Sequence, residues 1–353
     1  MTVGYAYDPA FMAHDTGNHP ESGQRLQAVV EHLAGCGLLE QLERLPVTRA
    51  APRDLARVHT TAMIERVRDL SEGGGGFIDL DTVISRGSYE AACMASGAAI
   101  TVCRAILDGQ VDSAYALVRP PGHHATRRRS MGFCLFNHIA VAAAWALEQG
   151  GLSRVAVIDY DVHHGNGTED ILGADPRVLY VSLHQYPFYP GTGHWRDTGE
   201  ADGKGSCINI PLPPNTGDKG FARAMQAIVL PALARFQPEL ILVSSGYDGH
   251  WVDPLAWMLL STEGYRHLAR LLCHAAQEFC AGRIGFVLEG GYHPQALAHS
   301  VATTISELLG QPYEDSLGPS GEPEADVEMV IQRIARWHDL EVSPLDDSSM
   351  APG

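Results

Sequence analysis

The chain has 353 residues, of which 45% are hydrophobic and 19% are charged, a composition typical of a globular protein with one large α/β domain or two smaller ones. Its 25 Lys and Arg residues against 42 Asp and Glu residues give a formal net charge of −17. That charge argues against non-specific binding to nucleic acid, and it is weakly compatible with cationic substrates such as lysine-bearing peptides or polyamines.

The seven cysteines are scattered, odd in number and without a Cys-x-x-Cys pair. This pattern predicts reduced, buried thiols in a cytoplasmic protein. The first residues lack the basic-then-apolar order of a secretory signal, and no apolar run approaches the roughly 20 residues that a membrane-spanning helix needs. We therefore expect neither nucleic acid nor a membrane as a partner, and the sequence leaves the oligomeric state open.

The N-terminal third is predicted to be helical after one strand. Val3–Tyr7 is the predicted strand, and Phe11–Arg25, rich in His, Gly, Asn and Pro, is a predicted loop. Helical segments are predicted at Leu26–Leu33, Leu38–Leu45, Pro52–Leu70 with a turn near His59, and Ser88–Leu107, the last one buried. Gly73–Gly76 follows no strand and precedes no Lys-Ser/Thr pair, so we interpret it as a loop and not as a phosphate cradle.

From residue 113 onward, strands and helices alternate. The predicted strands are Ser113–Val118, Arg154–Ile158, Val178–Leu183, Cys207–Ile210, Leu240–Ser245 and Ile284–Leu288. The predicted helices between and after them are Ile139–Leu147, Phe221–Ala234, Thr262–Phe279 and Gln295–Leu309. This alternation predicts an α/β fold with a single, mainly parallel sheet flanked by helices on both faces.

The composition changes near the end of the last of these helices. We therefore predict a catalytic domain over residues 1–312 and a polar C-terminal extension over residues 313–353. Within the extension we expect one helix, Val327–Trp337, and a frayed end of about ten residues.

The stretch Val155–Thr168 begins as an apolar run and ends in metal-capable side chains. Val155–Ile158 has the length and composition of a buried strand. Asp159, Asp161 and His163 follow at a spacing of two, which places their side chains on one face of an extended chain. Two oxygens and one nitrogen that converge in this way can hold a divalent cation.

Four other polar loops also follow predicted strands. They lie at Arg119–His124, His184, Ser244–Pro254 and Glu289–Tyr292. The carboxyl ends of parallel strands meet at one edge of a sheet, and ligands of such sheets bind there. We therefore expect all five loops to form one site.

Several long motifs, in this order, resemble the zinc-dependent histone deacetylase superfamily, in particular its class II and bacterial histone-deacetylase-like amidohydrolase branch. The motifs are RPPGHH (Arg119–His124), GFCLFN (Gly132–Asn137), IDYDVHHGNGT (Ile158–Thr168), SLHQYPFYPGTG (Ser182–Gly193), SSGYDGHWVDPL (Ser244–Leu255) and LEGGY (Leu288–Tyr292). The resemblance implies an arginase/deacetylase-like fold, one zinc ion and hydrolysis of an N-acyl amide on a lysine-like amine.

By this resemblance the zinc ligands are Asp161, His163 and Asp253. From the sequence alone, Asp248 and His250 compete for the role of third ligand, and the family pattern selects Asp253, immediately before Pro254. Two carboxylates and one His leave a position open for water, which is typical of a catalytic zinc site.

The resemblance also assigns the tandem histidines to the catalytic water. Asp159 would pair with His123, and because a carboxylate favours imidazolium, His123 would be cationic. Asn166 would face His124, and a neutral amide leaves His124 a free base near neutral pH. We therefore predict His124 as general base and later as general acid to the leaving amine.

Tyr292 matches the phenol that hydrogen-bonds the developing oxyanion. Some class II relatives carry His at this position and act poorly on acetyl-lysine, so the Tyr favours deacetylase activity. Phe133, with Gly132 beside it, and Tyr189 match the aromatic walls of the acyl-lysine tunnel. Leu255 stands where relatives with an acidic gatekeeper for polyamines have Glu, which favours peptide substrates.

Further positions follow from the same resemblance. A potassium ion is expected at the side chains of Asp159 and Ser182 and at backbone carbonyls that include that of Leu183. Asp81 is a candidate rim carboxylate for substrate amides. Arg25, in a motif with His19, Pro20 and Glu21, either lies at the foot of the tunnel or anchors a loop through a salt bridge. Arg127–Arg129 departs from the usual loop, and we interpret it as a solvated run near the rim without assigning it a role.

The sequence therefore predicts a zinc hydrolase that removes acyl groups from lysine side chains. Three alternatives remain: a deacetylase of acetylpolyamines or other small amides, a non-catalytic acyl-lysine binding protein on the same fold, and an arginase-like enzyme, for which the chain offers too few additional Asp ligands. Neither the natural substrate nor the preferred acyl length follows from the sequence.

Overall fold

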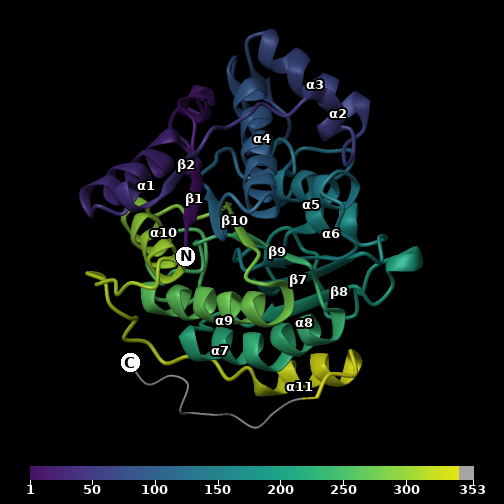
Figure 1. The fold of residues 1–353 in the computed structure, drawn as a ribbon, viewed down its shortest axis with the longest axis vertical. Helices are drawn as coiled ribbons and strands as arrows, with labels where there is room; N and C mark the ends of the chain where they lie inside the picture. The colour runs from purple at the N-terminus through teal and green to yellow at the C-terminus, as the bar shows by residue number, and fades with distance from the viewer. Residues whose placement is uncertain (342–353) are drawn as a thin grey trace.

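A computed structural model describes residues 1–341 of the chain, and its centre is one eight-stranded parallel sheet (Figure 1). The strands are β1 (Val3–Ala6), β2 (Glu43–Leu45), β5 (Ser113–Ala116), β6 (Val155–Asp159), β7 (Val178–Gln185), β8 (Cys207–Leu212), β9 (Leu240–Ser245) and β10 (Ile284–Leu288). Across the sheet they follow the order β2-β1-β5-β10-β9-β6-β7-β8. The predicted α/β fold with a parallel sheet is confirmed.

Helices cover both faces of this sheet (Figure 1). They are α1 (Gly23–Gly35), α2 (Pro52–Leu55), α3 (Thr61–Glu72), α4 (Ser88–Leu107), α5 (His138–Glu148), α6 (Asn166–Leu172), α7 (Asp218–Ala224), α8 (Leu230–Phe236), α9 (Thr262–Cys280), α10 (Pro294–Leu308) and α11 (Glu328–Trp337). A π-helical segment, Met225–Val229, joins α7 to α8. One face is covered by α4, α5 and α6, and the other by α1, α9 and α10.

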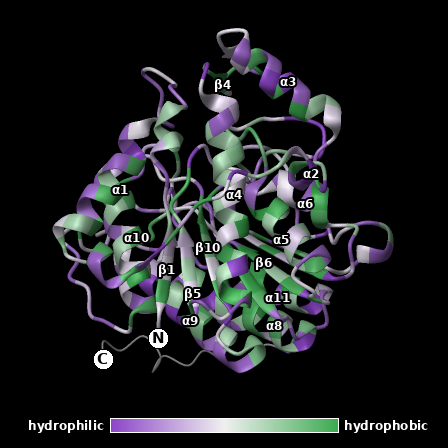
Figure 2. Ribbon diagram, turned by 45° about the horizontal axis from the view of Figure 1, so that its top comes forward, coloured by the Kyte–Doolittle hydropathy of each residue, from purple (hydrophilic) through white to green (hydrophobic). Residues whose placement is uncertain are grey.

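The central strands are hydrophobic along their whole length because both of their faces are covered. Every residue of β6 and β9 is buried, and Figure 2 shows these middle strands as mainly hydrophobic, whereas the outer helix α3 alternates hydrophobic and hydrophilic positions. The buried polar residues therefore collect where the strands end, which is where the predicted site lies.

Helix α4 requires one correction. We expected no segment long and apolar enough to cross a membrane, but Ser88–Leu107 meets that test by length and composition. Its most apolar window is 78% buried within the fold, so this helix fills the core, as its small alanine side chains allow.

The predicted helix Leu38–Leu45 is wrong. Its leucines repeat at helical spacing, yet only the short 3₁₀ turn Leu39–Gln41 forms, and Glu43–Leu45 becomes the edge strand β2. Gly4, Tyr5 and Ala6 of β1 pair with these three residues in parallel register, so sheet pairing overrides the local helical pattern.

A small antiparallel ribbon is an addition to the predicted single sheet. It consists of β3 (Gly76–Phe77) and β4 (Val83–Ile84), so the predicted loop Gly73–Gly76 ends in a strand residue. Pro52–Leu70 does divide near His59, into α2 and α3.

The C-terminal extension packs against the body of the α/β fold. Glu324 accepts backbone hydrogen bonds from Gly217, Lys219 and Gly220 at the start of α7. The predicted helix in this extension is confirmed as α11, which packs beside β8. The predicted frayed end lies outside the described residues, and the boundary at residue 312 stays a prediction.

Candidate active site

The strand-end cluster forms as the spacing predicts. Asp159 is the last residue of β6 and pairs in register with Ser182 of β7 and Ser244 of β9. Asp161 and His163 follow, and together with Asp248 they offer ligand atoms that all lie within 4.8 Å of one another. A potential metal site therefore exists at the carboxyl edge of the sheet.

Asp248 belongs to this cluster. The Nδ1 of His163 lies 2.9 Å from Oδ2 of Asp248 and 3.3 Å from Oδ1 of Asp161, and Oδ1 of Asp248 accepts the backbone N–H of Val162. One imidazole nitrogen thus meets an oxygen of each carboxylate, and two oxygens and one nitrogen suit a divalent cation. Of the candidates that the sequence left open for the third ligand, the structure therefore brings Asp248 into the triad.

Asp253, which the resemblance selects as third ligand, is not part of this triad within residues 1–341. Its Oδ2 accepts the N–H groups of Tyr292 over 2.6 Å and His293 over 3.2 Å, and its Oδ1 accepts the N–H of Leu255 over 3.0 Å, so this carboxylate holds the turn that carries Tyr292. Oδ2 of Asp161 accepts the N–H of Gly290 over 2.8 Å. Gly290 is required there because an added Cβ would lie against Oδ2 of Asp248 and 2.5 Å from Oδ2 of Asp161.

The cluster concentrates negative charge in a buried place. Burial, followed by the charge of Asp248, raises the pKa of Asp253 to about 7. Burial and the charge of Asp161 likewise raise the pKa of Asp248. Buried carboxylates that repel one another in this way are relieved by a cation, so the donor set fits a divalent metal ion.

The tandem histidines have different partners, as predicted. Nδ1 of His123 donates to Oδ2 of Asp159 over 3.1 Å, and Nδ1 of His124 donates to Oδ1 of Asn166 over 2.8 Å. Burial opposes a charge on His123, but Asp161 and Asp159 outweigh it and hold the pKa of His123 well above its usual range.

His124 is held neutral. Burial, then the charges of His123 and His163, put the pKa of His124 well below its usual range. Because Nδ1 carries the proton that is donated to Asn166, the lone pair of Nε2 is available as a base. The ring centroids of His124 and His163 lie 6.0 Å apart.

Glu289 supports the loop of the tandem histidines, which the sequence did not reveal. Its Oε2 accepts the N–H groups of Gly122 (2.6 Å) and His123 (3.1 Å), and its Oε1 accepts the hydroxyl of Ser244. Burial raises the pKa of Glu289 to about 7. The only sequence signal was its position at the end of a predicted strand.

Arg25 anchors the turn that carries Tyr292. It donates to the carbonyls of Gly291 (2.5 Å) and Glu289 (2.7 Å) and to the carboxylate of Glu21, and its guanidinium lies 4.8 Å from the centre of the Tyr292 ring. Of the two interpretations of Arg25, the structure therefore supports loop anchoring. Burial raises the pKa of Tyr292 well above its usual range, so its phenol stays a hydrogen-bond donor.

The aromatic residues predicted for the tunnel do gather at the site. Phe133 meets Tyr292 edge to face at 5.7 Å, and Tyr189 meets His124 edge to face at 5.1 Å. Phe133 has a φ of +67°, which is strained for a residue with a side chain and is common at functional sites, whereas its neighbour Gly132 adopts its φ of +56° without strain. Phe188, which we had not singled out, stacks on His163 at 5.3 Å.

Two further predicted substrate residues, Asp81 and Leu255, hydrogen-bond to neighbours of the site, and their position at the tunnel rim stays a prediction. Asp81 adjoins Asp79 and Thr82 in the β3–β4 ribbon, and burial and the proximity of Asp79 raise its pKa. Thr82 accepts the N–H of Phe133 over 3.2 Å, which joins this ribbon to the tunnel. Leu255 donates its N–H to Oδ1 of Asp253 over 3.0 Å.

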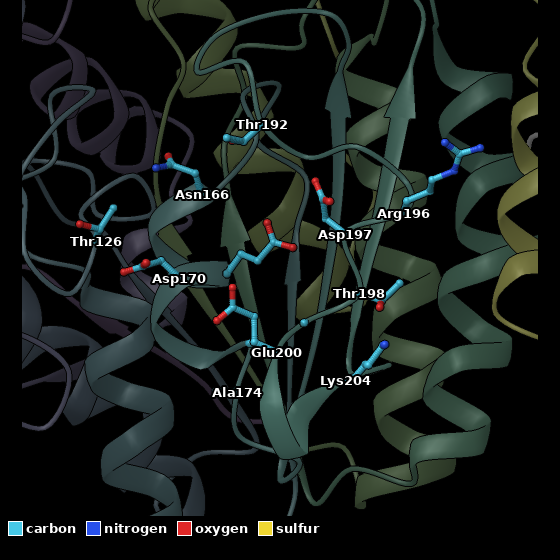
Figure 3. Close-up of a pocket in the computed structure, with 13 residues that line it drawn as sticks. Thr126, Asn166, Asp170, Ala174, Thr192, Arg196, Asp197, Thr198, Glu200 and Lys204 are labelled. Carbon is cyan, nitrogen blue, oxygen red and sulfur yellow. The ribbon is translucent and has the colours of Figure 1, made fainter.

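A separate hollow of about 520 Å³ adjoins Asn166 and Thr192 (Figure 3). Its charged lining residues are Glu169, Asp170, Asp197, Glu200, Arg196 and Lys204. The candidate metal ligands and the tandem imidazoles do not line it, so we do not interpret it as the acyl-lysine tunnel.

Comparison with known proteins agrees with this geometry. Residues 19–308 match the family described as "Histone deacetylase domain". The chain is 42% identical over 308 residues to the "Histone deacetylase-like amidohydrolase" of Pseudomonas aeruginosa, covering 87% of this chain and 80% of that protein. It is 37% identical over 314 residues to a "Probable deacetylase" of Archaeoglobus fulgidus, covering 88% and 87%. The solved structure "Crystal Structure of HDA15 HD domain" superposes with a TM-score of 0.87 at 32% identity, covering 96% of this chain and 94% of that one.

Proposed function

Because the chain belongs to the histone deacetylase family, we propose that it is a zinc-dependent hydrolase that removes acetyl or longer acyl groups from lysine side chains of proteins or peptides. The observation that carries this proposal is the meeting of separate strand-end loops at one buried point. There, His124 donates through Nδ1 to Asn166, and its ring centroid lies 6.0 Å from that of His163 in the acidic cluster and 5.1 Å from that of Tyr189.

The zinc would be held by Asp161, His163 and Asp248, whose ligand atoms lie within 4.8 Å of one another. This set leaves room for substrate, as catalytic zinc sites do. When bound, the ion polarises the amide carbonyl and lowers the pKa of water. A potassium ion is proposed nearby, at the neighbouring side chains of Asp159 and Ser182 and the carbonyl of Leu183, because hard cations prefer oxygen ligands.

The residues of the chain would then share the proton transfers. Nε2 of His124 takes a proton from the attacking water and later gives it to the departing lysine amine. His123, kept cationic by Asp159, stabilises the negative charge that develops in the transition state. The phenol of Tyr292 donates to the carbonyl oxygen as it becomes an oxyanion, while Phe133 and Tyr189 enclose the alkyl chain.

Turnover of fluorogenic acetyl-lysine and trifluoroacetyl-lysine substrates, with and without a hydroxamate chelator, tests this proposal. We expect turnover that the hydroxamate abolishes. Zinc-loaded protein that turns over no acyl-lysine substrate would contradict the proposal and favour a non-catalytic acyl-lysine binding protein.

Acetylated polyamines are a second candidate substrate class. They are favoured by the two carboxylates Asp79 and Asp81 at the rim, which could attract a cation, and disfavoured by the apolar Leu255. A panel of acetyl-lysine peptides against acetylspermidine separates the two classes by their kcat/KM values.

A further inference from the structure

The three arginines Arg127–Arg129, to which the proposed mechanism assigns no role, lie on an ordered turn. Thr126 donates its N–H to the carbonyl of Arg129 over 2.9 Å, and its Oγ1 accepts the N–H groups of Arg128 (3.3 Å) and Arg129 (3.0 Å). The N–H of Arg127 is bound separately by Oδ2 of Asp170. The turn is therefore held by its own hydrogen bonds.

Beside this turn lies a hollow of about 120 Å³. Its lining consists of Met63, Arg66, Val67, Ile78, Asp79, Arg128, Arg129 and Ser130. Arg66 comes from α3, so two separate segments supply the three guanidinium groups, whereas Arg127 does not line the hollow. The space suits a small charged group with a few waters and is too small for a cofactor, which needs about 300–1,000 Å³.

The positive charge of this hollow is not neutralised within the protein. Arg66, Arg128 and Arg129 form no ion pair with any carboxylate of residues 1–341. The one carboxylate in the lining, Asp79, already accepts the N–H groups of Asp81 and Thr82. Three positive charges against one negative charge make this a local basic site on a chain whose formal net charge is −17.

The hollow is close to the mouth of the tunnel. Ser130 is two residues before Gly132, so their Cα atoms are at most about 7.6 Å apart. At Gly132 an added Cβ would lie 2.5 Å from the His124 ring and 3.0 Å from the Tyr189 hydroxyl. Burial and the charge of Asp81 raise the pKa of the Tyr189 phenol, while Arg129 acts to lower it, which places Arg129 within electrostatic reach of the tunnel wall.

We propose that Arg66, Arg128 and Arg129 form a subsite that binds the carboxylate of an Asp or Glu side chain near the acyl-lysine of a peptide substrate. Guanidinium groups bind carboxylates through paired, charge-assisted hydrogen bonds. One residue of extended peptide spans about 3.3–3.6 Å, so the acidic residue lies within a few positions of the acyl-lysine. This inference rests on the proposed deacylase function and deepens it, because it names the peptide feature that the enzyme recognises beside the acyl-lysine.

The test uses the zinc-loaded full chain and acetyl-lysine peptides with Glu, Gln or Lys at each of four positions on either side of the acetyl-lysine. The readout is the ratio of kcat/KM for each Glu peptide to that for its Gln counterpart. We expect a ratio of about 3 to 10 at one or two positions, which falls toward 1 in about 0.5 M salt. Lys at the same positions should lower kcat/KM.

Variants of the run supply a matched control. R66A and the double variant R128A/R129A should bring the Glu-to-Gln ratio toward 1, whereas R127A, from the same exposed run but outside the hollow, should keep the ratio of the unmodified protein. A ratio near 1 at every position in the unmodified protein, or equal losses in R127A and R128A/R129A, would overturn the subsite. If Gln peptides are still turned over, the proposed function stands without the subsite; if no peptide is turned over, both fall.

Discussion

At the carboxyl ends of β6 and β10 the polar side chains are buried and hydrogen-bonded, whereas the turn at residues 126–129 exposes its arginines at the rim nearby. Asp159 and Asp161 are at most 1% exposed, and each binds neighbouring N–H groups or rings. Arg128 and Arg129 are exposed and unpaired among residues 1–341. Core packing therefore fixes the groups that perform chemistry, and surface loops remain free to set substrate preference.

The largest effect on kcat should come from a residue of the buried strand-end cluster. We expect His124→Ala to lower kcat about 10²- to 10⁴-fold, because it removes the proton acceptor and donor. Steady-state kinetics on acetyl-lysine peptide, with zinc content measured alongside, checks this. Near-normal turnover with zinc bound would contradict the assignment.

Asn166→Asp tests the assignment of His124 as general base without removing the His124 ring. A carboxylate at Nδ1 of His124 favours the imidazolium form, so the pKa of His124 should rise. Because His124 must be neutral to act as a base, the acidic limb of the kcat/KM profile should move to higher pH. A profile that does not move would mean that this ring does not control the reaction.

Tyr292→Phe should have the next largest effect. Removing one oxyanion donor costs about 2.7–4 kcal/mol, so kcat should fall about 10²- to 10³-fold with KM little changed. The Phe ring keeps the contacts with Phe133 and Arg25, so the fold should not suffer. A loss confined to KM would show that Tyr292 only binds substrate.

His59 joins the exposed turn to the buried core, so it tests the link between the two regions. Its Nδ1 donates to the carbonyl of Thr126, and its Nε2 accepts the N–H of Asn137; burial lowers its pKa to about 3. The unfolded chain takes up a proton near pH 6.5 and the folded ring does not until about pH 3. Stability therefore falls as pH drops through that window, by up to about 1.4 kcal/mol per pH unit.

Denaturant unfolding of His59→Gln at several pH values checks this. The Gln side chain retains one donor and one acceptor without a titrating ring, so the slope below pH 6.5 should be shallower by about 1.4 kcal/mol per unit. Above pH 7 the difference in unfolding free energy between variant and parent should stay constant. An unchanged acidic slope would contradict the burial of a neutral ring.

The smallest effect is expected at Glu324, which lies neither in the buried strand-end cluster nor in the arginine turn. Its variant serves as a reference for stability alone. Glu324→Ala removes the acceptor for three N–H groups at the start of α7 and should lower the unfolding free energy by about 1–2 kcal/mol. The exposed neighbour Glu322→Ala should change it by less than about 0.5 kcal/mol. Both variants should keep the kcat of the parent. Equal destabilisation by the two variants would show that Glu324 does not cap α7.

The strand-end residues were predictable because their pattern is local. Asp159, Asp161 and His163 alternate on one face directly after an apolar run, and parallel pairing fixes where that face lies. The choice between Asp248 and Asp253 was not local, since both follow β9 in one loop. Only the structure separates them, because Asp248 joins the triad of Asp161 and His163, whereas Asp253 accepts the N–H groups of the turn at Tyr292.

Contacts between distant segments left no signal in the sequence. Glu289 turns toward the N–H groups of Gly122 and His123, more than 160 residues earlier, and neither segment indicates the other. The segment Leu38–Leu45 has a helical pattern, but pairing with β1 makes its end a strand. Local periodicity predicts which residues are buried better than it predicts whether the backbone around them forms a helix or a strand.

Zinc stoichiometry and affinity in two variants test most directly whether Asp161, His163 and Asp248 hold one catalytic ion. The unmodified chain should bind one zinc ion, and Asp248→Ala should bind none at concentrations that saturate the unmodified chain. Asp253→Asn, which alters a carboxylate that accepts N–H groups of the turn at Tyr292, should keep the ion. Retention of zinc by Asp248→Ala together with its loss from Asp253→Asn would contradict the proposed site.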